Sequence, residues 1–156
     1  MTKIIIIGLF ILAAFFFFQR FTSAKNAPQN IAIGETFLLK NGAKKGIVTT
    51  DSGLQYEVLV KGEGTEHPTA KSKVEVHYHG TLIDGTVFDS SVDRGKTITF
   101  GLNQVIKGWT EGVQLMVKGD KFRFYIPSKL AYGNRSAGSI AAGSMLIFEV
   151  ELIDIK

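Results

Sequence analysis

The feature that most constrains this chain is an alternation of apolar and polar residues that recurs throughout the part after residue 50. In its clearest example, Val74, Val76 and Tyr78 alternate with polar residues, so one face of a strand is apolar and the other polar. Asp84-Gly85 is a hairpin turn signal between two such stretches. The alternation predicts strands at Leu54–Val60, Lys73–Tyr78, Thr86–Asp89, Thr97–Phe100, Lys121–Ile126 and Met145–Ile155.

One segment of this region has a helical period instead. Val105, Trp109 and Val113 are spaced at i, i+4 and i+8, with Ile106 and Met116 beside them, which predicts one short helix between residues 103 and 116. Together the two patterns predict an α+β fold, an antiparallel sheet folded over a single helix.

An uninterrupted apolar run of 15 residues, Ile4–Phe18, lies near the start of the sequence. As a helix it would measure roughly 22 Å, which is short of the ~30 Å hydrocarbon core of a bilayer. This length is typical of a signal peptide, and a short membrane anchor through residues 4–21 is the equal alternative if Arg20 reaches the headgroups. We therefore expect an apolar N-terminal helix that is a signal peptide or membrane anchor over residues 1–24. We also expect a protein that is exported or anchored on the periplasmic side of a bacterial inner membrane.

The segment between this run and the alternating region is more polar. Residues 25–34 contain Pro28 and favour a linker, and residues 35–45 favour a short helix that Gly46 would end. The predicted organisation is therefore a leader over 1–24, a linker with a short helix over 25–50, and one domain over 51–156.

Charge and composition exclude several classes of function. Three of the basic residues lie before residue 31. The rest of the chain has 15 basic and 14 acidic residues, so its charges nearly balance and no nucleic-acid-binding patch is predicted. The chain has no cysteine, which excludes disulfides and thiolate chemistry. His77 and His79 share a strand face with Glu75, but no third ligand is evident, so we expect a polar solvent-facing row, no metal site and no cofactor.

A set of large apolar side chains lies at the ends of the short elements. The simplest interpretation is that these side chains form the hydrophobic core. Because tryptophan and tyrosine each carry a polar group that needs a partner when buried, the set is equally consistent with the lining of a cavity. The set comprises Tyr78, Phe88, Phe100, Val105, Ile106, Trp109, Tyr132 and Phe148.

The order of several motifs resembles the FKBP-type peptidyl-prolyl cis/trans isomerases. The motifs are VHYHGTLIDGTVFDSSVDRG, QVIKGW followed by EGV, IPSKLAYG, and LIFEVELIDI. The approach GIVTTDSGLQYEVL is similar to bacterial members related to the macrophage infectivity potentiator proteins.

This resemblance implies a half-open antiparallel barrel of five or six strands around one helix, with a shallow apolar pocket. The eight residues of the apolar set would line the pocket, with Trp109 as its floor. Asp89 and Arg94 would form a polar pair beside it, while the Ile106 N–H and the Tyr132 hydroxyl would bind the carbonyls of the substrate. The implied activity is X-Pro isomerisation on proline-containing polypeptide clients, and macrolide inhibitors are a further implied class of ligand. A chaperone-like module that binds proline segments with little turnover is the alternative.

The sequence departs from the family pattern at two places. Ile98 stands where many relatives have a second aromatic residue, and it would keep the pocket wall apolar. After Tyr132, Ile140-Ala141-Ala142 replaces the usual Ile-Pro-Pro. Ile140 would still cap the pocket, while the loop would lose two fixed φ angles and become more mobile.

Overall fold

The computed structural model describes residues 26–156. The predicted signal peptide or anchor and its apolar run, Ile4–Phe18, lie outside the described residues. Within 26–156, none of the helices combines the length and the apolar character that crossing a bilayer requires.

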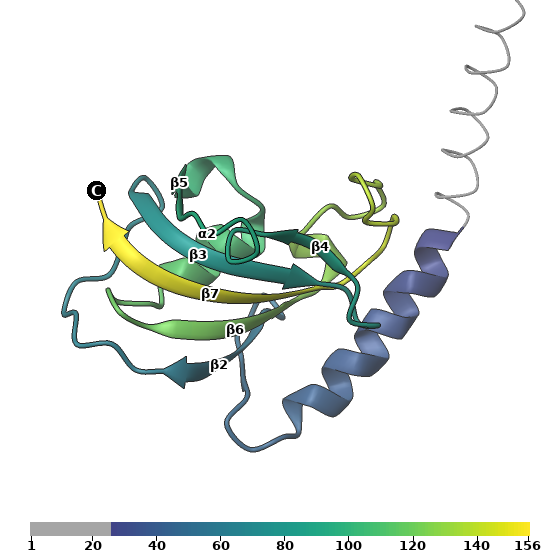
Figure 1. The fold of residues 1–156 in the computed structure, drawn as a ribbon. Helices are drawn as coiled ribbons and strands as arrows, with labels where there is room; N and C mark the ends of the chain where they lie inside the picture. Colours follow the sequence, from purple (N-terminus) through teal and green to yellow (C-terminus); the bar gives the residue numbers. More distant parts are fainter. Residues whose placement is uncertain (1–25) are drawn as a thin grey trace, which may run out of the picture.

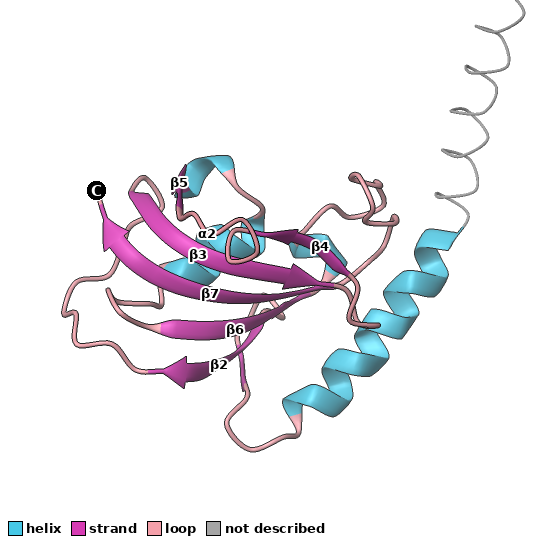
Figure 2. Ribbon diagram, viewed as in Figure 1, coloured by secondary structure: helices cyan, strands magenta, loops and turns pink. Residues whose placement is uncertain are grey.

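The fold is a single antiparallel sheet of seven strands that does not close into a barrel (Figures 1 and 2). The strand order is β1-β2-β6-β7-β3-β4, and β5 pairs with β3 beside β4. The strands are β1 (Val48–Thr49), β2 (Gln55–Val60), β3 (Lys73–Thr81), β4 (Val87–Ser90), β5 (Ile98–Gly101), β6 (Lys121–Ile126) and β7 (Leu146–Ile155). The prediction of an α+β fold with these antiparallel strands is confirmed, and β1 is an additional two-residue strand.

Strand β3 is the centre of the fold because it pairs with three other strands. Its residues are alternately buried and partly exposed, as the sequence pattern predicted, with Val74, Val76 and Tyr78 buried. Along one edge, β3 pairs first with β5 and then with β4, so Val74 lies opposite Phe100 and Gly80 lies opposite Asp89. This shared edge brings β5 and β4 to the same side of Tyr78.

The single helix against the sheet is shorter than the sequence predicted. A 3₁₀ turn, η1 (Leu102–Gln104), is followed by α2 (Lys107–Val113). Val105 and Ile106 between them have extended backbones, with ψ angles of 174° and 151°. The prediction of one short helix is confirmed, but its bounds of 103–116 are too wide, because α2 begins after the extended Val105 and Ile106 and ends at Val113.

Two glycines let α2 lie close to strand β6. A Cβ atom at Gly108 would come 2.5 Å from the Ile126 side chain, and one at Gly112 would come 2.6 Å from the Phe124 ring. Such distances are below van der Waals contact, so larger residues would push the helix away from the sheet. The close packing fixes the position of Trp109, which lies between the two glycines on α2.

A longer helix covers residues 26–42 and lies across the end of the sheet, where β3 and β6 end and β7 begins (Figure 1). The predicted linker over 25–34 is therefore wrong from residue 26 onward, and the predicted short helix over 35–45 begins earlier and ends earlier. Ala27, Gly34 and Asn41 are buried and recur every seven residues, which is the spacing of one helix face. These residues are small or polar, so a search for an apolar stripe misses this face.

Specific contacts attach this helix to the sheet. The Gln55 side chain of β2 donates a hydrogen bond from Nε2 to the Leu38 carbonyl (2.8 Å) and accepts one from Asn41 Nδ2 (3.0 Å). The rings of Phe37 and Tyr125 lie 5.9 Å apart. The helix is therefore packed on the domain and does not act as a free linker.

Candidate active site

An open pocket of about 430 Å³ lies between α2 and the concave side of the sheet. Its wall combines residues from β3, β4, β5, β7, the η1–α2 segment and the loop after β6. The lining residues are Tyr78, Asp89, Phe100, Gln104, Val105, Ile106, Trp109, Tyr132 and Phe148. The structure thus brings together eight of the residues that the sequence selected.

The indole of Trp109 is the central group of the pocket, and three aromatic rings stand almost perpendicular to it. The centroids of Tyr78, Phe100 and Phe148 lie 5.4, 5.7 and 5.3 Å from its own, with interplanar angles of 85°, 87° and 83°. Edge-to-face packing of this kind is favourable because the ring edge carries positive charge and the face negative charge. Trp109 is 4% exposed. Its indole therefore forms the floor of the pocket, and the three rings that stand perpendicular to it form the walls.

Asp89 provides the charge of the pocket, and both of its carboxylate oxygens are hydrogen-bonded. The Tyr78 hydroxyl donates to Oδ2 at 2.5 Å, and Arg94 Nη1 donates to Oδ1 at 2.5 Å. Arg94 Nη2 also donates to the Tyr78 hydroxyl at 3.1 Å, and the guanidinium lies 5.8 Å from the centroid of the Tyr78 ring. These three residues therefore form one rigid hydrogen-bonded unit.

The same contacts determine the protonation states. Burial acts to raise the pKa of Asp89, but hydrogen bonds from Tyr78 and Arg94 outweigh it, so the pKa lies below the ordinary value of 3.8. Burial, and then the hydrogen bond to Asp89, raise the pKa of Tyr78 above its ordinary value of 10.0. At neutral pH the unit therefore holds an ionised carboxylate and a neutral phenol.

Two hydrogen-bond donors at the pocket are available to a ligand. The Ile106 N–H, which directly precedes α2, makes no hydrogen bond to the rest of residues 26–156. The Tyr132 side chain is 43% exposed, and none of the hydrogen bonds among residues 26–156 involves its hydroxyl. Both groups lie in the lining of the same pocket, so a carbonyl-bearing ligand there could accept hydrogen bonds from them.

Four of the predicted site residues do not line the pocket. Phe88 packs edge-on against Phe148, with ring centroids 5.3 Å apart, and Arg94 reaches the pocket through Asp89 and Tyr78. Ile98 is half-buried against the core. Ile140 is buried and pairs with Ala137 in a two-residue bridge, so its role as a cap stays a prediction.

Gln104 lines the pocket but was not selected from the sequence. It lies in η1, directly before the extended residues Val105 and Ile106. The apolar periodicity of this segment carries no signal of the break between η1 and α2, next to which Gln104 lies.

The histidines of β3 belong to the opposite, outer face of the sheet. His77 Nδ1 lies 2.9 Å from the Ser91 hydroxyl, and His79 Nδ1 lies 2.8 Å from the Ser90 hydroxyl. Across residues 26–156, no group of three or more metal-binding side chains converges.

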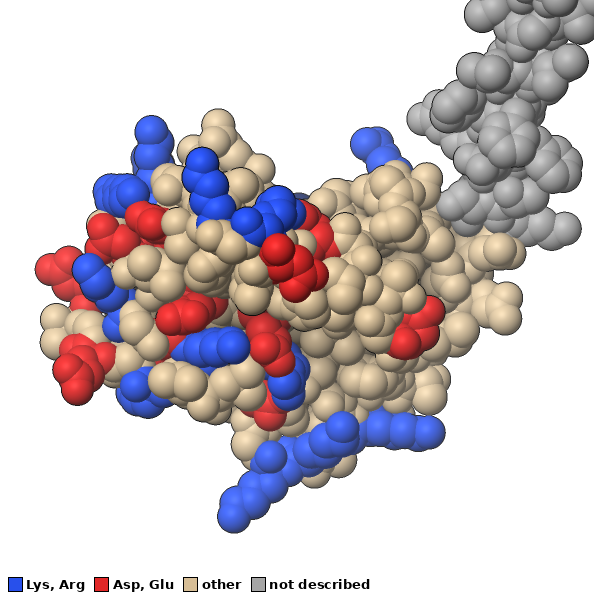
Figure 3. Space-filling view, viewed as in Figure 1, with Lys and Arg blue, Asp and Glu red and all other residues tan. Residues whose placement is uncertain are grey.

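Acidic and basic side chains alternate on this outer face (Figure 3). Arg123 of β6 pairs with Glu57 of β2 at 2.7 Å and with Glu149 of β7 at 2.5 Å. On these strands the charges are therefore paired with the opposite sign.

Comparison with known proteins identifies the family. The family model described as FKBP-type peptidyl-prolyl cis-trans isomerase matches residues 64–153, and the model described as the domain amino-terminal to that isomerase matches residues 11–58. The chain therefore belongs to the FKBP-type peptidyl-prolyl cis-trans isomerase family.

Individual relatives agree with this assignment. The FKBP-type peptidyl-prolyl cis-trans isomerase FkpA of Aeromonas hydrophila is 58% identical over 132 residues, which are 85% of this chain and 49% of that protein. The outer membrane protein MIP of Legionella longbeachae is 48% identical over 133 residues, 85% of this chain and 57% of that protein. The crystal structure of FkpA from Escherichia coli superposes with a TM-score of 0.82 at 43% identity, covering 86% of this chain and 63% of that one. The chain thus spans about half the length of the curated relatives it matches.

Proposed function

We propose that the aromatic pocket is the active site of a peptidyl-prolyl cis/trans isomerase that acts on proline-containing polypeptides. The observation that carries the proposal is the open, apolar hollow floored by Trp109, with two available donors in its wall. A proline ring is compact and apolar and fits between the aromatic rings of the wall, while the neighbouring peptide carbonyls need the donors.

The chemistry requires no nucleophile, because no bond to another atom is made. Rotation about the X–Pro bond breaks amide resonance against a barrier of ~18–20 kcal/mol. The planar amide is more dipolar than the twisted one, so a pocket that excludes water favours the twisted transition state. Removing about 5 kcal/mol of the barrier would accelerate rotation by roughly 10³- to 10⁴-fold.

Seven residues of the pocket have a proposed role in this reaction. Trp109 supports the proline ring, and the walls from Tyr78, Phe100 and Phe148 exclude water. The Ile106 N–H and the Tyr132 hydroxyl bind substrate carbonyls. Asp89 orients the site through Tyr78 and Arg94, and it does not transfer protons.

The location and further ligands are also part of the proposal. The apolar run before residue 19 supports export or anchoring on the periplasmic side of a bacterial inner membrane. The similarity to the outer membrane protein MIP of Legionella longbeachae supports a site of action beyond the cytoplasm. Clients would then be newly exported chains that finish folding there. Macrolide inhibitors would compete for the same aromatic pocket.

A protease-coupled assay on a short X-Pro peptide tests the proposed activity. We expect the slow cis phase of cleavage to accelerate in proportion to protein concentration. A protein that binds the peptide but leaves this phase unchanged would be a chaperone-like binding module. A protein that does not bind the peptide at all would have no role in proline recognition.

A further inference from the structure

The loop between β6 and β7, residues 127–145, connects the proposed active site to the long helix. Tyr132 of this loop lines the pocket, while Ala142 and Gly143 lie against helix 26–42. The sequence has no proline after Pro127, and the three glycines of the loop all adopt positive φ angles. The loop backbone therefore has few intrinsic restraints and depends on its contacts for a fixed position.

The helix provides two such contacts. Asn30 Nδ2 donates a hydrogen bond to the Ala142 carbonyl at 2.8 Å. At the next residue, a Cβ atom on Gly143 would come 2.3 Å from the Ala27 carbonyl oxygen, so the two backbones touch directly. Ala27 and Ala142 are almost fully buried by this contact.

The restraint passes from the helix to Tyr132 through backbone hydrogen bonds. The Gly143 N–H donates to the Gly133 carbonyl at 2.8 Å, and the Gly133 N–H donates to the Ser128 carbonyl at 2.8 Å. Gly133 directly follows Tyr132, so only one peptide unit separates this network from the residue in the pocket.

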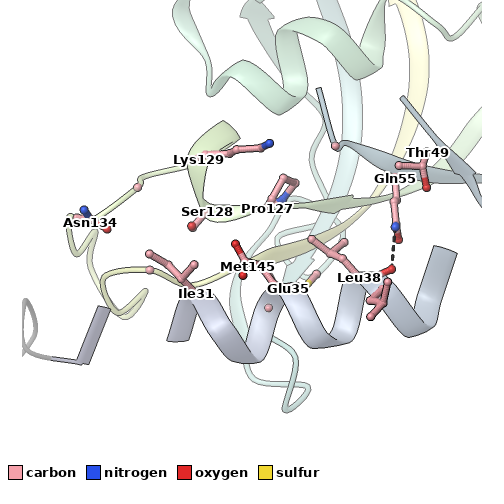
Figure 4. A pocket seen from close by; sticks show the side chains of 15 residues that line it. Ile31, Glu35, Leu38, Thr49, Gln55, Pro127, Ser128, Lys129, Asn134 and Met145 are labelled. Atoms are coloured by element: carbon pink, nitrogen blue, oxygen red, sulfur yellow. Dashed lines mark hydrogen bonds between the residues drawn. The ribbon is translucent and has the colours of Figure 1, made fainter. Parts of the chain in front are cut away.

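Beyond these two contacts, Gly34 of the helix packs against the Met145 side chain at the end of the loop. A hollow of about 520 Å³ lies between the loop and the helix, and Figure 4 shows Ile31 and Leu38 on the helix side and Ser128 and Lys129 on the other. Among the described residues, the bond from Asn30 is the one side-chain hydrogen bond that joins helix 26–42 to the loop. Asn30 is thus the polar side chain through which the helix can restrain this loop.

We propose that Asn30 is a positioning residue for isomerisation. It holds the Ala142 carbonyl, and through Gly143 and Gly133 it keeps the Tyr132 hydroxyl directed at the pocket. Helix 26–42 is then a working part of the catalytic unit. The inference rests on the proposed isomerase activity and adds a residue outside the pocket to it.

The test is a double-mutant cycle in the full chain. Asn30→Asp removes the donor at nearly constant volume, and Gln29→Glu is the control, because it makes the same change at an exposed position of the same helix. We expect Asn30→Asp to lower kcat/KM by about threefold to tenfold, the share of one hydrogen bond, and Gln29→Glu to leave it unchanged. In a Tyr132→Phe background, Asn30→Asp should have no further effect, because the hydroxyl that it positions is absent.

Each alternative result has a separate meaning. If Asn30→Asp matches Gln29→Glu, or if its effect multiplies with that of Tyr132→Phe, Asn30 does not position the hydroxyl. A loss of activity that only follows the unfolded fraction, measured by circular dichroism at the assay temperature, also overturns the positioning role. An inactive wild-type chain would instead refute the proposed function itself.

Discussion

The aromatic pocket and the junction between the helix and the loop are built in opposite ways. The pocket uses large side chains, with Trp109 surrounded by three perpendicular rings. The junction uses the smallest residues, since Ala27 and Gly143 let two backbones approach each other. The difference teaches that a binding pocket can be recognised in a sequence from its bulky residues. The contact that positions the pocket depends on alanine and glycine, whose small side chains give no such signal.

The largest expected effect concerns the floor of the pocket. Trp109→Ala should lower the free energy of unfolding by about 3–5 kcal/mol, because it removes a buried ring and leaves a cavity. It should also abolish binding of proline peptides. Urea unfolding measures the loss of stability. It is followed by circular dichroism, because the variant lacks the only tryptophan of the chain and so cannot be followed by tryptophan fluorescence. Leu115→Ala, at a side chain that is 38% exposed, is the control, and equal stability of the two variants would contradict the proposed floor.

The junction should be sensitive to an added methyl group. Gly143 and Gly138 both have positive φ angles, +79° and +56°, but only Gly143 has a backbone atom in the path of a new Cβ. Both alanine variants should have a free energy of unfolding about 1–2 kcal/mol lower, because alanine adopts the left-handed conformation less readily than glycine. Gly143→Ala should lose about 1–3 kcal/mol more through overpacking against Ala27. Equal unfolding free energies would mean that the helix does not press on the loop.

A smaller effect separates catalysis from packing. Tyr132→Phe should lower kcat/KM by about threefold to tenfold, the share of one hydrogen bond. Its free energy of unfolding should change by less than about 0.5 kcal/mol, because the side chain is largely exposed. Tyr56→Phe on β2, away from the pocket, is the matched control. A Tyr132→Phe chain that unfolds would show that the residue serves the core.

The smallest effect expected is that of pH. The pKa of Asp89 lies below 3.8 and that of Tyr78 above 10.0, so neither group titrates near neutrality and kcat/KM should be flat between about pH 6 and 8. Because the pKa of Asp89 is depressed in the folded chain, its stabilising contribution is full above pH 3.8 and is lost as pH falls through the folded pKa. A bell-shaped profile centred near neutrality would show that a proton is transferred.

The sheet and most of the pocket could be predicted from the sequence because alternation and large residues leave a strong signal. Val74, Val76 and Tyr78 of β3 are buried as their spacing indicated. The pocket residues were found through family motifs, since alternation alone did not distinguish a core from a lined cavity.

The remaining features leave no such signal. The helix over 26–42 packs through Ala27, Gly34 and two asparagines, and its Pro28 resembles a linker residue. The break before α2, which brings Gln104 into the pocket, depends on the extended backbone of Val105 and Ile106. Both depend on contacts between segments that are distant in sequence, and local patterns do not encode these contacts.

The central claim is that the pocket accelerates rotation about an X-Pro bond. The most direct test is the rate of exchange between the cis and trans forms of a short X-Pro peptide at equilibrium. Two-dimensional NMR exchange spectroscopy measures this rate with a catalytic amount of the protein. We predict that cross-peaks between the two forms grow with protein concentration. The exchange rate obtained from them should be about threefold to tenfold lower for Tyr132→Phe than for the wild type. Peptide signals that shift on binding while the exchange rate stays at its uncatalysed value would contradict the account.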